Sequence, residues 1–526
     1  AAVPYFYEVV FLEDRARISR ADGTIASRLE IIVSPEDDAE IRCLSLTNNG
    51  TRTHEIEVTS YSEIVLAPPL ADSAHPAFSN LFIQTEYLPQ ACGLIAQRRP
   101  RAENDPRIWA AHVLSCSDIS DGVQYETDRV RFLGRGQTLR TPAAVMDGRP
   151  LSNTVGAVLD PIFSLRTRVR IEAGATVHVT FTTLVAPSRQ AVEDLADKYH
   201  STATFDRVSD LAWTHAQIQL RHLRIKPDEA QLFQTLANRL LYADPSLRAN
   251  SKLMKLNRLN VTGLWRFGIS GDRPIVLLRV TTREDRTIAD QLLRAYEYWR
   301  MKRLSADLVI LNEKEITYSN EFQVLLENMV RENQAFAAIH EYGGHGEIFV
   351  LRADQLSEEE RVLLQTTARA VLLSNRGTLA EQLMRHPKPT PEFIQPQALP
   401  APAVESSKPL IVPTDLEYFN GLGGFASDGR EYVIVLGKGQ WTPAPWINVI
   451  ANAEFGFTVT ELGGGCTWCL NSRMNQLTPW TNDPVSDTPG EIFYIRDDET
   501  GDLWSPTALP IRIDDASYVI RHGMGY

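Results

Sequence analysis

The sequence predicts a multidomain α+β protein with a partial antiparallel β-sandwich, a helical segment, a small parallel α/β connector and a second partial β-sandwich. Three observations predict this fold class. Apolar and polar residues first alternate with a period of two, apolar residues from about 189 to 245 then recur every three or four positions, and strand-length apolar runs finally alternate with helical patterns. At 526 residues, the chain is long enough for more than one buried core.

The first part, residues 1–187, is predicted to consist of β-strands. Apolar residues from Val169 to Phe181 alternate with Arg and Thr on either side of Ala173-Gly174-Ala175, a pattern that predicts a β-hairpin with its turn at the glycine. Similar alternation over residues 54–60 predicts a further strand. Strands of this kind with one buried face are expected to form an antiparallel sandwich.

Residues 188–260 are predicted to be helical, because their apolar side chains recur at helical spacing. In residues 261–385, apolar runs such as Ile275–Leu278 alternate with helical patterns, which predicts βαβ units on a small parallel sheet. The helix predicted over 357–374 opens with a capping box, Ser357-Glu-Glu-Glu360.

Residues 386–413 contain many prolines and few large apolar side chains, the composition of a semi-extended linker. The last part, residues 414–526, returns to strand patterns. Three of them are Tyr432–Val435, Gly456–Thr460 and Ile492–Arg496.

Charge and hydropathy exclude several classes of protein. The chain has 53 basic and 66 acidic residues, a net charge of -13, and an acidic surface repels phosphate backbones, so a nucleic-acid partner is not expected. No apolar run is long enough to span a bilayer, and Ala1–Phe11 lacks the pattern of a signal peptide. Five cysteines, an odd number, favour a reducing compartment over a disulfide framework.

Several short motifs have ordinary structural interpretations. Cys466-Thr-Trp-Cys469 lacks the second ligand pair of a structural zinc site, and its thiols point to opposite faces if the segment is a strand. His340-Glu-Tyr-Gly-Gly-His345 has its histidines five apart across two glycines, so a loop is expected instead of a zinc-protease helix. The glycines of 268–272 and 421–424 predict tight turns. We therefore predict no metal site and no cofactor site in this chain.

One segment, Trp468–Glu491, has the composition of a sugar-binding loop. Flat aromatic faces contact the apolar surface of a sugar, and carboxylate, amide and guanidinium groups bind its hydroxyls. The loop supplies this mixture in Arg473, Trp480, Asn482, Asp483 and Asp487. The alternative is a sandwich loop in which Asp and Asn cap their own turns.

The same region resembles a known family. The segments that carry the resemblance are Thr442–Asn452, Asn471–Arg473, Leu477–Asp487, Arg496–Gly501 and Trp504–Thr507. They resemble the β-sandwich of glycoside hydrolase family 94, which includes cellobiose, chitobiose and β-1,2-oligoglucan phosphorylases. A second set resembles the multidomain cyclic β-1,2-glucan synthases: His75–Ser79, Glu126–Gly136, Leu159–Arg166, Gly263–Asp272 and Asp307–Glu313.

The resemblance implies a place for each part of the chain. Because Phe6–Val10 resembles Ser517–Arg521, residues 1–187 correspond to the back half of one family-94-like sandwich and residues 414–526 to the front half of a second. The chain is then a portion of a glycosyltransferase that makes cyclic β-1,2-glucans, osmoregulated periplasmic glucans, from UDP-glucose.

The resemblance also sets expectations for chemistry and location. The catalytic acid of family 94 lies in a helical barrel that this chain does not match, so we assign no catalytic residue and expect the chain alone to be inactive. UDP-glucose, and phosphate in a phosphorolytic step, are substrates of the full enzyme. The expected partners are β-glucan and the remaining domains of the synthase, with membrane contact only through those domains, on the cytoplasmic face of the bacterial inner membrane. Self-association, a stand-alone inverting β-glucoside phosphorylase and a non-catalytic carbohydrate-binding scaffold stay open.

Overall fold

A computed structural model describes residues 3–524 except 101, 103–104, 106, 118–121, 243, 315–320, 340–345, 385–412 and 414. The chain divides into two compact units. Unit 1 contains Ala1–Val10, Ala16–Ser209 and Pro396–Tyr526, and unit 2 contains Phe11–Arg15 and Asp210–Gln395. The linker predicted over 386–413 and the loop predicted at 340–345 lie almost entirely outside the described residues.

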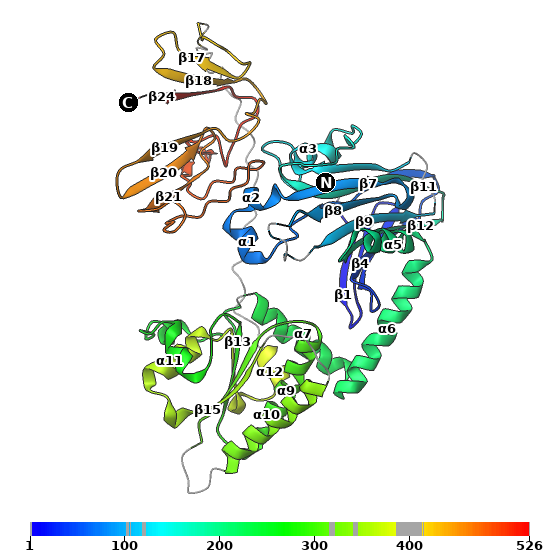
Figure 1. The fold of residues 1–526 in the computed structure, drawn as a ribbon, viewed down its shortest axis with the longest axis vertical. Helices are drawn as coiled ribbons and strands as arrows, with labels where there is room; N and C mark the ends of the chain where they lie inside the picture. The colour runs from blue at the N-terminus through cyan, green and yellow to red at the C-terminus, as the bar shows by residue number, and fades with distance from the viewer. Residues whose placement is uncertain are drawn as a thin grey trace. The chain divides into compact units, whose positions relative to one another are not determined.

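The amino-terminal part of unit 1 contains two β-sheets (Figure 1). The larger sheet has the order β1 (Phe6–Phe11), β2 (Arg15–Asp22), β3 (Ile25–Val33), β4 (Ala39–Asn48), β12 (Thr176–Ala186), β9 (Trp109–Cys116), β8 (Gly93–Arg98) and β7 (Ile83–Leu88). The smaller sheet contains β10 (Gln124–Asp128), β11 (Pro161–Ile171), β5 (His54–Thr59) and β6 (Ser62–Glu63). An apolar core that includes Leu94, Leu114 and Leu165 fills the space between them. Helix α5 (Arg189–His200) covers the other face of the larger sheet through Val192, Ala196 and Tyr199.

The hairpin predicted around Gly174 is wrong, although its strands and its turn are present. β11 pairs with β5 and β10 in the smaller sheet, whereas β12 pairs with β4 and β9 in the larger one. Val169 of β11 and Val179 of β12 therefore meet across the core between the sheets, not side by side within one sheet. Alternation shows that a strand has one apolar face, but it does not show which strand is its neighbour.

A buried histidine lies at the centre of this sandwich. His112 on β9 stacks between Phe163 and Phe181, with ring centroids 5.9 and 5.7 Å away. Its Nδ1 bonds Thr183 Oγ1 and its Nε2 bonds Ser60 Oγ, each at 2.9 Å. Burial, with a smaller contribution from the charge of Arg42, lowers the pKa of His112 from 6.5 to about 4.

This histidine is expected to make unit 1 sensitive to mild acid. The folded-state pKa lies below the unfolded value, so the unfolded chain binds the proton first and stability is lost as the pH falls below about 6.5. Between pH 7 and pH 5 the loss due to His112 is about 2 kcal/mol. Urea denaturation at both pH values should show this loss in the wild type and not in His112→Gln. The exposed His178 provides the matched control, His178→Gln, and parallel pH profiles for the wild type and His112→Gln would contradict the assignment.

Unit 2 is built on a four-stranded parallel sheet with helices on both faces (Figure 1). The strand order is β15 (Ile348–Arg352), β14 (Asp307–Asn312), β13 (Ile275–Val280) and β16 (Ala370–Leu373). One face packs against α7 (Pro227–Leu241), α9 (Arg286–Met301), α10 (Glu321–Ile339) and α12 (Leu379–Leu383), and the other against the 3-10 helix η2 (Val261–Phe267) and α11 (Glu358–Thr367). Because both faces are covered, the strands are mostly apolar, as their sequence indicates. The predicted parallel sheet is confirmed.

The helix predicted over 357–374 begins where expected but is shorter. Ser357 and Glu360 form the predicted capping box, with Ser357 N donating to Glu360 Oε2 at 2.8 Å. The helix ends at Thr367, and residues 370–373 form strand β16 instead. The short apolar run that begins at Ala370 is compatible with a helix or a strand by pattern alone. In the structure it is a strand because it pairs with β13.

The remaining part of unit 1 consists of three small sheets. These are β17 (Gly423–Phe425), β18 (Glu431–Leu436) and β24 (Tyr518–Gly523); β19 (Ile447–Ala451), β20 (Phe455–Thr460) and β21 (Gly465–Cys469); and β22 (Ile495–Arg496) with β23 (Leu503–Trp504). The strand predicted over 492–496 is thus limited to its last two residues, because its partner β23 is equally short.

The predicted fold class, α+β with antiparallel sheets and one parallel sheet, is confirmed. The helices predicted between 189 and 245 are α5, α6 (Thr204–Leu223) and α7. Over the described stretches of the chain, no helix has both the length and the hydropathy needed to cross a membrane.

Candidate functional site

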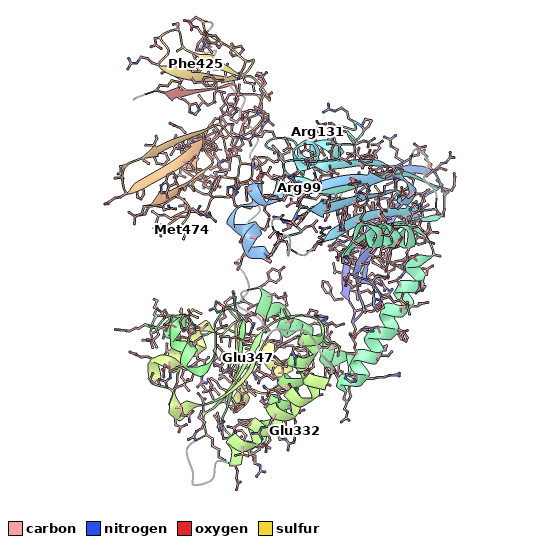
Figure 2. The ribbon with its side chains drawn as sticks, in the orientation of Figure 1. Arg99, Arg131, Glu332, Glu347, Phe425 and Met474 are labelled. Carbon is pink, nitrogen blue, oxygen red and sulfur yellow. The ribbon has the colours of Figure 1, made fainter. Side chains whose placement is uncertain are left out.

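All five residues that the sequence analysis proposed for ligand binding line one pocket of unit 1. The pocket has a volume of about 830 Å³. Its walls come from β19, β20, β21, the long loop that follows β21, and the connection between α1 (Pro69–Ala74) and α2 (Pro76–Asn80). Met474, labelled in Figure 2, belongs to that long loop. We call this cavity the junction pocket; its lining includes His75, Trp468, Arg473, Trp480, Asn482, Asp483 and Asp487.

Two tryptophans supply the aromatic surface of the junction pocket. Trp480 is 50% exposed and lies edge-on to His75, with ring centroids 6.5 Å apart. Trp468 projects from β21 over β20, where an added Cβ at Gly456 would lie only 2.7 Å from its ring. A glycine at this position therefore lets the indole lie against the strand. The arrangement offers flat apolar surface beside polar groups, as a sugar requires.

Asp483 is held by an arginine of the first sandwich. Arg129 donates to both carboxylate oxygens of Asp483, at 2.9 and 3.0 Å, and Ser486 Oγ and Val485 N donate to the same group at 2.5 and 2.9 Å. Burial alone would raise the pKa of Asp483, but the hydrogen bonds from Arg129 and Ser486 outweigh it and hold the pKa well below its usual range. Asp483 is thus a charged structural anchor at the edge of the pocket.

Asp487 also has partners within the protein. Its Oδ2 accepts from Thr460 Oγ1 at 2.7 Å and lies 3.6 Å from Arg135 Nη2. Burial raises the pKa of Asp487 despite these contacts. Its backbone is in the left-handed region at φ 47°, and a Cβ on Gly464 would lie 2.3 Å from its Oδ1. Both aspartates therefore fit the structural alternative, capping and anchoring the loop, and their role in ligand binding stays a prediction.

Arg473 and Asn482 differ from the aspartates. The Arg473 side chain is exposed, and its guanidinium has no hydrogen-bond or charge partner among the residues that the structure describes. The Asn482 backbone is left-handed at φ 49°, and its buried Nδ2 has no partner within the described part of the chain. Of the five predicted residues, Arg473, Asn482 and Trp480 are therefore the ones whose side chains the described part of the chain leaves available to a ligand.

The loop that carries these residues is fixed to the first sandwich by a buried valine and a second arginine. Val485 is fully buried in an apolar cluster with Phe132, Leu133, Leu151 and Ile162. Its carbonyl oxygen accepts from Gly136 N at 2.8 Å and from Arg135 Nη1 at 3.0 Å. Arg129 adds bonds to Asp160 and Glu63, at 2.9 and 3.1 Å. The pocket therefore depends on contacts between segments far apart in the sequence.

Sequence reasoning missed four residues of this site: His75, Arg129, Arg135 and Trp468. The first three lie within the motifs His75–Ser79 and Glu126–Gly136, which carried the family resemblance but received no role. The contact between these motifs and the loop around Trp480 joins segments far apart in the sequence. Local residue spacing therefore cannot predict it.

Cys466 and Cys469 lie on strand β21, as the structural interpretation of the motif assumed. Both are free thiols, and burial raises the pKa of Cys466. Among the described residues, no group of three or more His, Cys, Asp or Glu side chains is arranged to hold a metal ion.

Comparison with known proteins places this site in a family. The model of the glycosyl hydrolase 94 supersandwich domain matches residues 2–202 and 430–526, more than half of the chain. The chain belongs to this glycosyl hydrolase 94 family. The resemblance drawn from the sequence motifs is confirmed. The two matched stretches of the supersandwich also meet at the junction pocket, since His75 lies in the first and Trp480 in the second.

Individual relatives differ in how much of the chain they match. The cyclic beta-(1,2)-glucan synthase NdvB of Rhizobium meliloti is 40% identical over 525 residues, which is 98% of this chain and 18% of that synthase. An N,N'-diacetylchitobiose phosphorylase of Vibrio furnissii is 38% identical over 106 residues, 20% of this chain and 13% of its own length. A solabiose phosphorylase of Paenibacillus borealis is 33% identical over 108 residues, 20% of this chain and 14% of its own. The chain thus spans less than a fifth of each relative.

Proposed function

We propose that this chain is a portion of a cyclic β-1,2-glucan synthase and that its junction pocket binds the β-1,2-linked glucan. The observation that carries the binding role is that one pocket is lined by the half-exposed Trp480 and by Arg473, whose guanidinium has no partner among the residues that the structure describes. An aromatic face and a free donor group are the two features that bind the apolar and hydroxyl surfaces of a sugar.

The extent of the similarity supports the synthase over the phosphorylases. The match to the synthase runs through both sandwich parts and the parallel-sheet unit, whereas the phosphorylase matches cover about a fifth of the chain. For the full enzyme we propose UDP-glucose as donor substrate and phosphate as a further substrate. The other partners are the remaining domains, which place this portion on the cytoplasmic face of the bacterial inner membrane. The chain itself supplies binding surface, and we propose that it is inactive without the catalytic acid of another domain.

Trp480→Ala is the variant that tests the binding role. Titration calorimetry of the whole chain with a linear β-1,2-glucan oligosaccharide should show binding, and the variant should raise Kd about 30-fold, since truncating a central tryptophan costs about 2 kcal/mol. The melting temperature should not change, because half of the Trp480 surface is already exposed.

Trp213, 57% exposed on α6 in unit 2, provides the matched control. Trp213→Ala should leave Kd at the wild-type value. A wild-type chain that does not bind β-1,2-glucan, or a Trp480→Ala variant with unchanged Kd, would overturn the proposed role of the pocket.

A further inference from the structure

His75 lines the junction pocket from the first sandwich. The two tryptophans of the pocket, Trp468 and Trp480, come instead from the last part of the chain. It lies between α1 and α2, and its ring stands edge-on to Trp480. Figure 1 shows α1 and α2 beside the sheet that contains β21, and the pocket lining includes residues of both.

One hydrogen bond selects the tautomer of the neutral His75 ring. Phe78 N donates to His75 Nδ1 at 3.1 Å, which caps the start of α2. A neutral imidazole that accepts at Nδ1 carries its proton on Nε2. The Nε2–H has no partner among the described residues, and His75 is exposed. The backbone N–H of Phe78 therefore orients the His75 ring, and the ring presents its Nε2–H as a hydrogen-bond donor.

We infer that His75 donates its Nε2–H to an oxygen of the carbohydrate in the junction pocket, so that one bound sugar contacts both matched stretches of the supersandwich. The inference rests on the proposed function and extends it. A neutral β-glucan presents hydroxyl and ether oxygens as acceptors, and the ring that carries this donor lies 6.5 Å, centroid to centroid, from Trp480, whose face would carry the sugar ring.

Contact with both stretches has a thermodynamic consequence. The segment that carries Trp480 is held on the first sandwich by Arg129 and Val485, and a ligand that also binds His75 adds a contact that exists only while the segments are together. A ligand that binds only the assembled form stabilises that form. Glucan binding and the docking of this loop are therefore coupled.

His75→Asn tests the inference without removing the cap of α2. The Asn side-chain oxygen accepts from a backbone N–H at a helix start, as His75 Nδ1 does, but the side chain is too short to replace the Nε2–H donor. We expect the variant to keep the wild-type melting temperature and to raise Kd for linear β-1,2-glucan about three- to tenfold, the effect of one neutral hydrogen bond. His178→Asn, an exposed histidine that bonds Ser45, should not change Kd.

The outcomes separate the two claims. If His75→Asn binds glucan as tightly as the wild type while Trp480→Ala binds weakly, the inference about His75 is wrong and the proposed function stands. If the wild type does not bind β-1,2-glucan, the proposed function itself fails. A His75→Asn variant that weakens binding only in proportion to a fall in melting temperature would mark His75 as a structural residue and would also overturn the inference.

Discussion

Replacing Arg129 by alanine is expected to release the loop that carries Asp483 from the first sandwich, at a cost of about 3–5 kcal/mol, the usual effect of removing one partner of a buried ion pair. Arg129 contacts Asp483, Asp160 and Glu63, and its loss leaves partly buried carboxylates without their counter-charge. Hydrogen exchange of the amides of Val485 and Ser486, which bond Asp483, should accelerate by a factor of about 10² to 10⁴. The affinity for β-1,2-glucan should decrease in the same variant, because the loop carries pocket residues.

Arg131, two positions after Arg129 on the short helix α3 (Arg129–Leu133), is the matched control. It is labelled in Figure 2, its side chain is 59% exposed, and it makes one longer contact, 3.6 Å to Asp128. Arg131→Ala should leave exchange in the loop unchanged, because exposed ion pairs contribute little. A double-mutant cycle with Asp483→Ala should give a coupling well above that of an exposed pair. Equal exchange rates in Arg129→Ala and the wild type would show that the ion pair does not hold the loop.

The second large effect is expected at Gly136. Its backbone is left-handed at φ 74°, and a Cβ there would lie 2.2 Å from the ring of Trp441. Gly136→Ala therefore adds backbone strain of about 1–2 kcal/mol to overpacking of about 1–3 kcal/mol. If the Trp441 ring moves to make room for the new methyl group, it also loses its cation–π contact with Arg512, whose guanidinium lies 4.0 Å from the ring centroid. We expect a loss of about 2–5 kcal/mol, measured by urea denaturation.

Gly148→Ala separates strain from collision. Gly148 is also left-handed, at φ 68°, but no atom lies within 4 Å of an added Cβ. The Gly148 variant should show only the strain, and the difference between the two variants measures the contact between Gly136 and Trp441. Equal losses in both variants would mean that this contact does not contribute to stability.

The features that the sequence predicted correctly are those encoded over short distances. The parallel sheet of unit 2 follows from runs such as Leu308–Leu311, which are apolar on both faces because helices cover both. The capping box at Ser357 is equally local. The five residues proposed for ligand binding line one pocket because they lie on a single loop, and their role in ligand binding stays a prediction.

The features that it missed depend on partners far away in the chain. The segments on either side of Gly174 read as a hairpin, since their alternation is the same whether they pair with each other or face each other across a core. Asp483 reads as a sugar ligand or a turn cap because its strongest partner, Arg129, lies 354 positions away. Composition identifies the groups in a site, but the fold decides which of them remain free for a ligand.

The distance between Arg129 and Asp483 also sets an order of events during synthesis. They are separated by 354 positions, so at a translation rate of 5–20 residues per second roughly 20–70 s pass between them. During that time the apolar cluster of Phe132, Leu133 and Ile162 is incomplete, because Val485 has not yet been synthesised. Residues 210–395 emerge meanwhile and have cores of their own to form. The junction pocket is therefore assembled late, and the apolar surface that receives Val485 is open to chaperones until the segment that carries Val485 has left the ribosome.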